Sequence, residues 1–152
     1  MTAIPKIAGM LETGVCVDDL ERSSRFYKEV LGLQTVLEID RLHAFDLGPG
    51  EVLLLFDREL SQHDANSPIG LVPGHRTDGR AHFCFRIAQD QYDPWKAHLE
   101  RQGVPVTSEV HWPAGGRSFY FNDPEGNVLE MATPGLWENY PKDFRETNAD
   151  GE

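Results

Sequence analysis

Hydrophobic and polar residues alternate in two blocks of the chain, and the first block predicts the order strand, helix, strand, strand, strand. An alternating run ends at Asp18, where Glu21 three residues on completes a capping-box pattern that predicts a helix N-cap. Gly32 predicts the end of that helix. The predicted strands are 10–18, 34–39, 42–47 and 52–56.

The second block predicts the same order. Asp93 followed by Pro94 predicts a helix start with proline at the first helical position, and Gly103 predicts the helix end. The predicted strands are 81–88, 104–110, 118–121 and 128–132. Between the last two, the sequence DPEG at 123–126 is typical of a type I turn.

The two blocks form an internal repeat at an offset of roughly 70 to 76 residues. We therefore predict one domain, 1–152, with an α+β fold built from two βαβββ modules. Its predicted parts are a first module at 8–57, a linker at 58–79 that is rich in Pro, Gly, Asn, Asp and Ser, a second module at 80–134 and a C-terminal tail at 135–152. In this repeat Glu130 corresponds to Leu54.

Composition narrows the classes of partner. Fourteen Lys and Arg stand against 25 Asp and Glu, and the formal net charge of -11 would repel phosphate backbones, so we expect no nucleic-acid partner. Acidic residues interrupt the first apolar run, and no basic leader precedes it, so we expect no membrane insertion or export and a cytoplasmic protein. Cys16 and Cys84 form no CxxC pair, and both are expected to be reduced.

Strand alternation places three potential metal ligands on faces that point away from the predicted core. His82 falls opposite the apolar side chains of its strand, and Glu12 and Glu130 do so in the first and last strands. If the two modules curl their sheets around a common cavity, two carboxylates and an imidazole could hold a divalent ion there. Taken alone, each residue has a simpler interpretation, because a strand histidine is more often a surface or hydrogen-bonded residue than a ligand.

Several segments resemble the vicinal oxygen chelate superfamily, which comprises glyoxalases, bleomycin-resistance proteins and extradiol dioxygenases. VDDLERS at 17–23, FY at 26–27 and VLGL at 30–33 are similar to the opening helix of these proteins. HFCF at 82–85 is similar to the first strand of their second module, and FYFNDPEGNVLE at 119–130 to a signature that ends in a metal-binding glutamate. The resemblance covers about residues 8–134 and implies a glyoxalase-like fold, with curved mixed sheets around a cavity.

The resemblance also implies one divalent metal ion per chain at Glu12, His82 and Glu130. Glu12 departs from the His or Gln common at the first position, so Mn, Fe, Ni, Zn and Mg all stay open as the metal. Leu54 stands where glyoxalase I proteins place a fourth ligand, and its apolar side chain disfavours simple glyoxalase I activity. Related proteins often pair modules between chains, so we expect a homodimer.

The resemblance further implies that Tyr120 lines the substrate pocket, as a tyrosine does in fosfomycin-resistance thiol transferases. A core aromatic with a satisfied hydroxyl is the alternative interpretation of Tyr120. Glu130 and Tyr120 are the candidate catalytic residues, as groups able to move protons. No residues for an organic cofactor are predicted, because AGG at 114–116 lacks a following GK[ST] and precedes a strand rather than a helix.

Two functions follow from the resemblance. The first is a metal-dependent lyase, isomerase, transferase or dioxygenase whose small substrate chelates the ion through adjacent oxygens. The second is a non-catalytic drug- or small-molecule-binding protein of the bleomycin-resistance type. That branch lacks the metal ligands, whereas all three positions here hold residues that can coordinate an ion, and this favours the enzyme.

Overall fold

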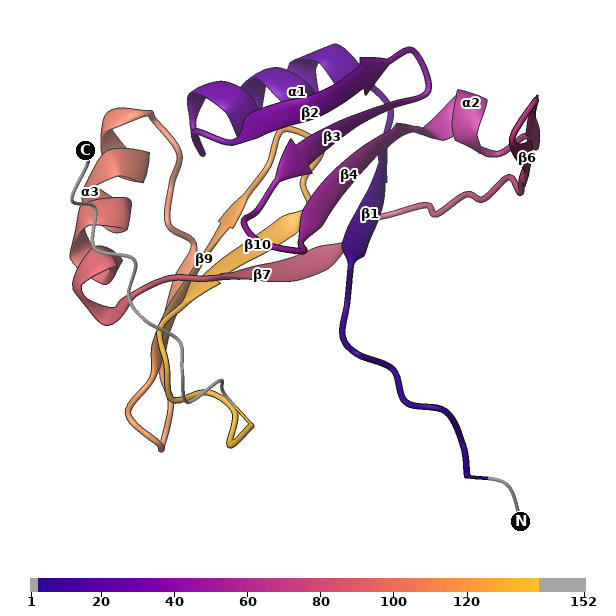
Figure 1. Ribbon diagram of the computed structural model, residues 1–152. Helices are drawn as coiled ribbons and strands as arrows, with labels where there is room; N and C mark the ends of the chain where they lie inside the picture. The colour runs from indigo at the N-terminus through magenta and orange to yellow at the C-terminus, as the bar shows by residue number, and fades with distance from the viewer. Residues whose placement is uncertain (1–2, 140–152) are drawn as a thin grey trace, which may run out of the picture. The chain divides into compact units, whose positions relative to one another are not determined.

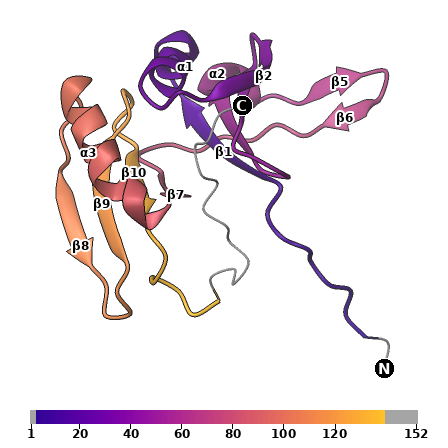
Figure 2. The same cartoon turned by 60° about the vertical axis from the view of Figure 1, so that its left-hand side comes forward.

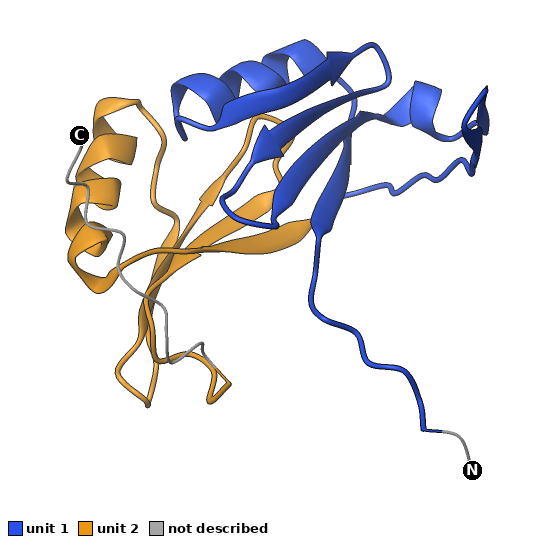
Figure 3. Cartoon of the chain, viewed as in Figure 1, with its two compact units in different colours: residues 1–79 blue, residues 80–152 orange. Residues whose placement is uncertain are grey.

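A computed structural model describes residues 3–139 of the chain, and the chain divides into two compact units, residues 1–79 and 80–152 (Figure 3). Each unit holds one mixed four-strand sheet and one ten-residue helix in the order strand, helix, strand, strand, strand. The predicted α+β fold with two βαβββ modules is therefore confirmed. None of the helices between residues 3 and 139 has the length and apolar character needed to cross a membrane.

The sheet of the first unit has the order β1-β4-β3-β2, in which β1 is parallel to β4 and the other pairs are antiparallel. Helix α1 lies across one face of this sheet (Figure 1). The core between them is formed by buried residues of both layers: Val15, Val17, Tyr27, Phe45, Leu53 and Leu55. The elements are β1 (Glu12–Val17), α1 (Leu20–Glu29), β2 (Gln34–Ile39), β3 (Leu42–Asp46) and β4 (Val52–Asp57).

Helix α1 begins one residue later than the capping-box prediction. Its N-cap is Asp19, whose Oδ1 accepts a hydrogen bond from Arg22 N at 2.9 Å. Asp18 is not the cap because its carboxylate pairs instead with Arg58, at 2.6 Å from Nε. The predicted helix end is confirmed, since Gly32 follows α1 with a φ of 70°, a conformation that glycine adopts without strain.

The segment 58–79 contains elements that the hydrophobic pattern did not predict. They are a short helix, α2 (Arg58–Ser61), and a two-strand hairpin of β5 (Ala65–Ser67) and β6 (Gly70–Val72), which projects from the first unit (Figure 2). Arg58 is buried and donates to Cys16 O at 3.0 Å and to Thr77 O. This guanidinium ties the start of α2 to the end of β1 and to the last residues of the unit.

The second unit repeats the topology with the strand order β7-β10-β9-β8, in which β7 is parallel to β10. Helix α3 packs on one face of this sheet (Figure 2) and buries Tyr92 and Leu99 with Phe119, Phe121 and Leu129. The elements are β7 (His82–Arg86), the 3₁₀ turn η1 (Gln89–Gln91), α3 (Tyr92–Arg101), β8 (Ser108–His111), β9 (Arg117–Asn122) and β10 (Val128–Ala132).

The starts of α3 and β8 differ from prediction. Helix α3 begins at Tyr92 after Gln91, because η1 starts the winding earlier, and Pro94 is tolerated in the first turn, where backbone N–H groups have no intrahelical partner. Strand β8 begins at Ser108 instead of residue 104, since Val104 N bonds back to Leu99 O at 2.9 Å and Pro105 has no N–H for a ladder. The part of the predicted tail beyond residue 139 lies outside the described residues.

The registers of the two sheets match the internal repeat. Glu12 pairs with Val52 in β4 as His82 pairs with Val128 in β10. Two residues on, Gly14 pairs with Leu54 as Cys84 pairs with Glu130. The predicted correspondence of Leu54 with Glu130 therefore holds within each sheet.

Candidate functional site

His82 and Glu130 meet on the face of the second sheet that points away from α3. Their neighbours Phe83, Leu129 and Met131 are directed to the opposite face, as strand alternation predicted. His82 Nε2 lies 3.4 Å from Glu130 Oε2, and the imidazole side chain is 51% exposed while the carboxylate side chain is 6% exposed.

A turn built from polar residues holds the start of β7 beside the start of β10, the two strands that carry His82 and Glu130. Asp123 Oδ1 accepts from the backbone of Glu125 at 3.0 Å and of Asn127 at 2.9 Å, and Gly126 N closes the turn on Asp123 O at 3.0 Å. The Asn127 side chain donates to Asp123 Oδ2 at 2.9 Å and accepts from Ala81 N at 2.8 Å. The predicted turn at 123–126 is confirmed, and its last link holds the residue before His82 beside the start of β10.

The imidazole of His82 is oriented by a backbone carbonyl. Its Nδ1 lies 2.8 Å from Val128 O, and because a carbonyl can only accept, Nδ1 carries the hydrogen. In the neutral ring Nε2 is then an acceptor that faces a carboxylate oxygen. Two acceptors that face each other are satisfied by a hydrogen held between them or by a bound cation. A ring nitrogen fixed through its partner nitrogen in this way is typical of metal-ligating histidines.

Glu130 is a buried carboxylate that the protein does not fully satisfy. The residue is 5% exposed, and its Oε1 has no hydrogen-bond partner among residues 3–139. Burying an ionised carboxylate oxygen without a partner is costly, so such a group points to a ligand that supplies the missing interaction. The His82–Glu130 pair therefore fits a divalent cation, because imidazole and carboxylate are suitable ligands and Glu130 Oε1 lacks a hydrogen-bond partner among the described residues.

Tyr120 and Cys84 flank Glu130 on the neighbouring strands. Tyr120 is the register partner of Glu130 in β9, and its ring stacks beside that of His82 with centroids 6.0 Å apart. Burial, then the Glu130 carboxylate, raises the pKa of the Tyr120 phenol. The same two causes raise the pKa of the Cys84 thiol to about 12, although the residue keeps solvent contact. Both groups are therefore protonated at neutral pH.

Glu12 is the first residue of β1 in the first unit, where it is exposed and pairs with Val52. Two residues on, Gly14 lies against the ring of Phe56, since a Cβ added there would approach Phe56 Cε2 to 2.7 Å. Within either unit alone, the described residues bring no three His, Cys, Asp or Glu side chains together for a metal ion. His82 and Glu130 are thus brought together inside one unit, and the participation of Glu12 stays a prediction.

The polar environment behind Tyr120 was not predicted from the sequence. Trp112 Nε1 donates to Ser118 Oγ at 3.0 Å, and Ser118 is fully buried two residues before Tyr120 in β9. No local motif joins Trp112 to the site, because the two residues meet across the turn between β8 and β9. The sequence signal available was the turn AGG at 114–116, which reverses the chain between them.

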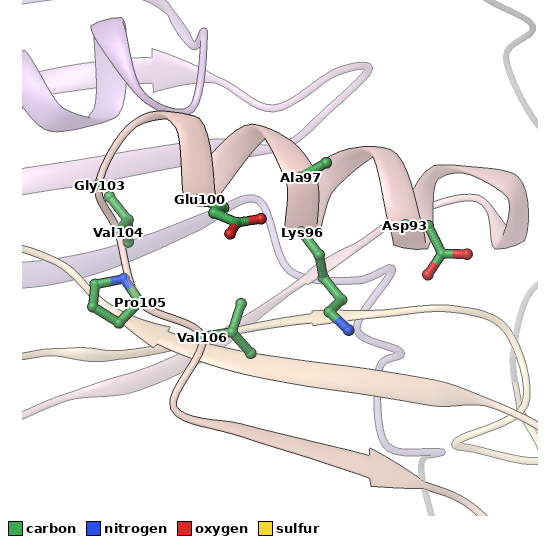
Figure 4. A pocket seen from close by; sticks show the side chains of 8 residues that line it. All are labelled: Asp93, Lys96, Ala97, Glu100, Gly103, Val104, Pro105 and Val106. Carbon is green, nitrogen blue, oxygen red and sulfur yellow. The ribbon is translucent and has the colours of Figure 1, made fainter.

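A groove of about 590 Å³ lies elsewhere in the second unit, between α3 and the segment that follows it (Figure 4). It is lined by Asp93, Lys96, Ala97, Glu100 and residues 103–106. Lys96 is engaged by Glu109, with Nζ 2.5 Å from Oε1. None of the predicted site residues lines this groove, and its side chains form no acid–base or ligand set, so we assign it no chemistry.

Comparisons with known proteins place this geometry in context. Residues 9–131 match the family model of the Glyoxalase/Bleomycin resistance protein/Dioxygenase superfamily. Glutathione transferase FosA of Serratia marcescens is 31% identical over 117 residues, which are 77% of this chain and 74% of that protein. Metallothiol transferase FosB of Bacillus licheniformis is 25% identical over 134 residues, 88% of this chain and 80% of that protein. The crystal structure of lactoylglutathione lyase from Agrobacterium tumefaciens aligns with a TM-score of 0.80 and 36% identity, over 88% of this chain and 99% of that chain.

Proposed function

This chain belongs to the Glyoxalase/Bleomycin resistance protein/Dioxygenase superfamily, and we propose that within it the protein is a metal-dependent enzyme. Its substrate is a small molecule that binds the ion through two neighbouring oxygens. The observation that carries the proposal is the pair formed by His82 and the buried Glu130, whose Oε1 has no partner among the described residues. A pair of acceptors held together in this way favours a bound cation over a purely structural role.

In the proposed site, His82 and Glu130 would hold the ion together with Glu12. When bound, the ion supplies Lewis-acid chemistry that stabilises negative charge on a substrate oxygen. The Nδ1–H bond of His82 to Val128 O keeps Nε2 available as a ligand. One histidine and two carboxylates would suit Mn, Fe, Ni, Zn or Mg, and the apolar Leu54, which is equivalent to Glu130 in the repeat, supplies no ligand.

Tyr120 supplies proton chemistry beside this pair. Its raised pKa keeps the hydroxyl protonated at neutral pH, so it is suited to donate a hydrogen bond or a proton to an oxygen that gains charge. Its register partner across the β9–β10 pair, Glu130, is the proton acceptor in this proposal. We propose these two as the catalytic residues.

The names of the relatives suggest the class of reaction. A glutathione transferase, a metallothiol transferase and a lactoylglutathione lyase each act on a thiol compound or its adduct by their names. We propose that the reaction here joins a small thiol to an oxygen-bearing substrate or rearranges such an adduct. Cys84 is not part of this proposal, because burial and the Glu130 carboxylate raise the pKa of its thiol.

The test is cobalt substitution of metal-stripped protein, followed by addition of acetohydroxamate, which presents two neighbouring oxygens. An enzyme site with open positions predicts that one cobalt ion binds per chain and that acetohydroxamate changes its visible spectrum, while the control variant His111→Ala behaves as wild type. A protein that binds no cobalt, or a cobalt spectrum that acetohydroxamate leaves unchanged, would contradict the proposal. The former result would favour the binding-protein function.

A further inference from the structure

The buried hydroxyl of Ser118 is joined to the indole of Trp112, next to a residue of the proposed site. Trp112 Nε1 donates to Ser118 Oγ at 3.0 Å, and Ser118 is 0% exposed. Ser118 and Tyr120 are two residues apart in β9, so their side chains leave the strand on the same face. This is also the face of Glu130, the register partner of Tyr120.

The direction of the Trp112 bond decides what Ser118 can do. An indole N–H only donates, so Ser118 Oγ accepts from it and keeps its own hydrogen for donation to another group. The Tyr120 side chain leaves β9 on the same face as that hydroxyl. Burial and the Glu130 carboxylate raise the pKa of the Tyr120 phenol, whereas hydrogen bonding by Ser118 lowers it. A buried hydroxyl with one fixed donor has a defined orientation, unlike one that rotates freely.

Trp112 is itself held by the turn that joins β8 to β9. Its backbone N donates to Gly116 O at 2.8 Å, and Gly115 N donates to Trp112 O at 2.9 Å. Gly116 is packed against the backbone of Gly135, since an added Cβ would come within 2.7 Å of Gly135 C. The backbone of Trp112 is thus held by a turn whose last glycine is closely packed against Gly135.

We infer that Trp112 is a positioning residue, which orients the Ser118 hydroxyl and through it fixes the Tyr120 hydroxyl beside Glu130. Tyr120 is only half-buried, so its ring needs such a restraint to stay at one side of the carboxylate. The inference rests on the proposed function, in which Tyr120 moves a proton at this site. Trp112 and Ser118 thus support the proposed site without contacting the ion or the substrate.

The test uses the full-length protein labelled with 3-fluorotyrosine, in which Tyr120→Phe identifies the fluorine signal of Tyr120. Trp112→Phe removes the indole N–H and keeps an aromatic ring, and Ser118→Ala removes the hydroxyl. Trp95→Phe is the matched control, because it makes the same change on α3. We expect the Tyr120 signal to move toward its position in urea-unfolded protein in Trp112→Phe and Ser118→Ala, and to stay unchanged in Trp95→Phe.

A loss of stability alone would not give this pattern, since the signals of the buried Tyr27 and Tyr92 would then respond together with that of Tyr120. An unchanged Tyr120 signal in folded Trp112→Phe and folded Ser118→Ala would overturn the inference. Cobalt binding is measured on the same samples and separates the two proposals. A shifted Tyr120 signal in protein that binds no cobalt would refute the proposed function alone, whereas normal cobalt binding with an unchanged signal would refute the positioning role alone.

Discussion

Replacing Glu130 with methionine is expected to stabilise the metal-free protein while abolishing metal binding. The Glu130 carboxylate is buried, and Oε1 has no partner among residues 3–139, which costs about 1 to 3 kcal/mol. Methionine has a similar volume and leaves no buried polar atom at this position, so that cost is removed. His82 loses a partner but is half exposed and stays hydrated. The variant loses the interactions of Glu130 with His82 and Tyr120, and the net rise in the free energy of unfolding should be about 1 to 2 kcal/mol.

Urea unfolding in the presence of a chelator measures this difference, with Glu100→Met on the exposed face of α3 as the control. The control should stay within about 0.5 kcal/mol of wild type. Addition of metal at 100 times its dissociation constant should then stabilise the wild type by about 2.7 kcal/mol and leave Glu130→Met unchanged. A metal-free Glu130→Met protein that is less stable than metal-free wild type by about 1 kcal/mol or more would contradict this expectation.

Two further predictions concern residues outside the site. Arg58→Met should lower the free energy of unfolding by about 2 to 3 kcal/mol, because Cys16 O and Thr77 O lose a charged donor, and urea unfolding that shows no loss would contradict the assigned bonds. Tyr92 is buried, and burial followed by the Glu109 carboxylate raises its pKa to about 12. The folded state thus favours the neutral phenol, and its stabilising effect is complete below the unfolded pKa of about 10 and is lost as pH rises to about 12. Tyr92→Phe should therefore show a smaller fall of unfolding free energy between these pH values than wild type, and parallel curves would refute this.

Much of the fold could be predicted because the sequence pattern is local and repeated. The alternation in 81–88 placed His82 and Cys84 opposite Phe83 and Phe85, and strand pairing preserves that alternation. The repeat predicted the equivalence of Leu54 with Glu130, which the two registers show. The turn at 123–126 was predictable because Asp123 and Gly126 satisfy it through bonds over four residues.

The rest depends on contacts between residues far apart in the chain. The local sequence predicts Asp18 as the helix cap, but its carboxylate accepts a hydrogen bond from Arg58, forty residues further along the chain. Alternation also could not predict that Glu130 is buried, because exposure on that face depends on Tyr120 and other neighbours contributed by separate strands. The bond from Trp112 to Ser118 crosses a turn whose geometry is set by close packing of Gly116 with Gly135, which no local pattern encodes.

The most direct test of the metal-dependent function is elemental analysis of protein purified without added metal. We predict one divalent ion per chain in the wild type and in the control variant His111→Ala. We predict lowered occupancy in His82→Ala, Glu130→Ala and Glu12→Ala. Equal metal content in the wild type and all of these variants, or no divalent ion in any of them, would contradict the proposed metal site.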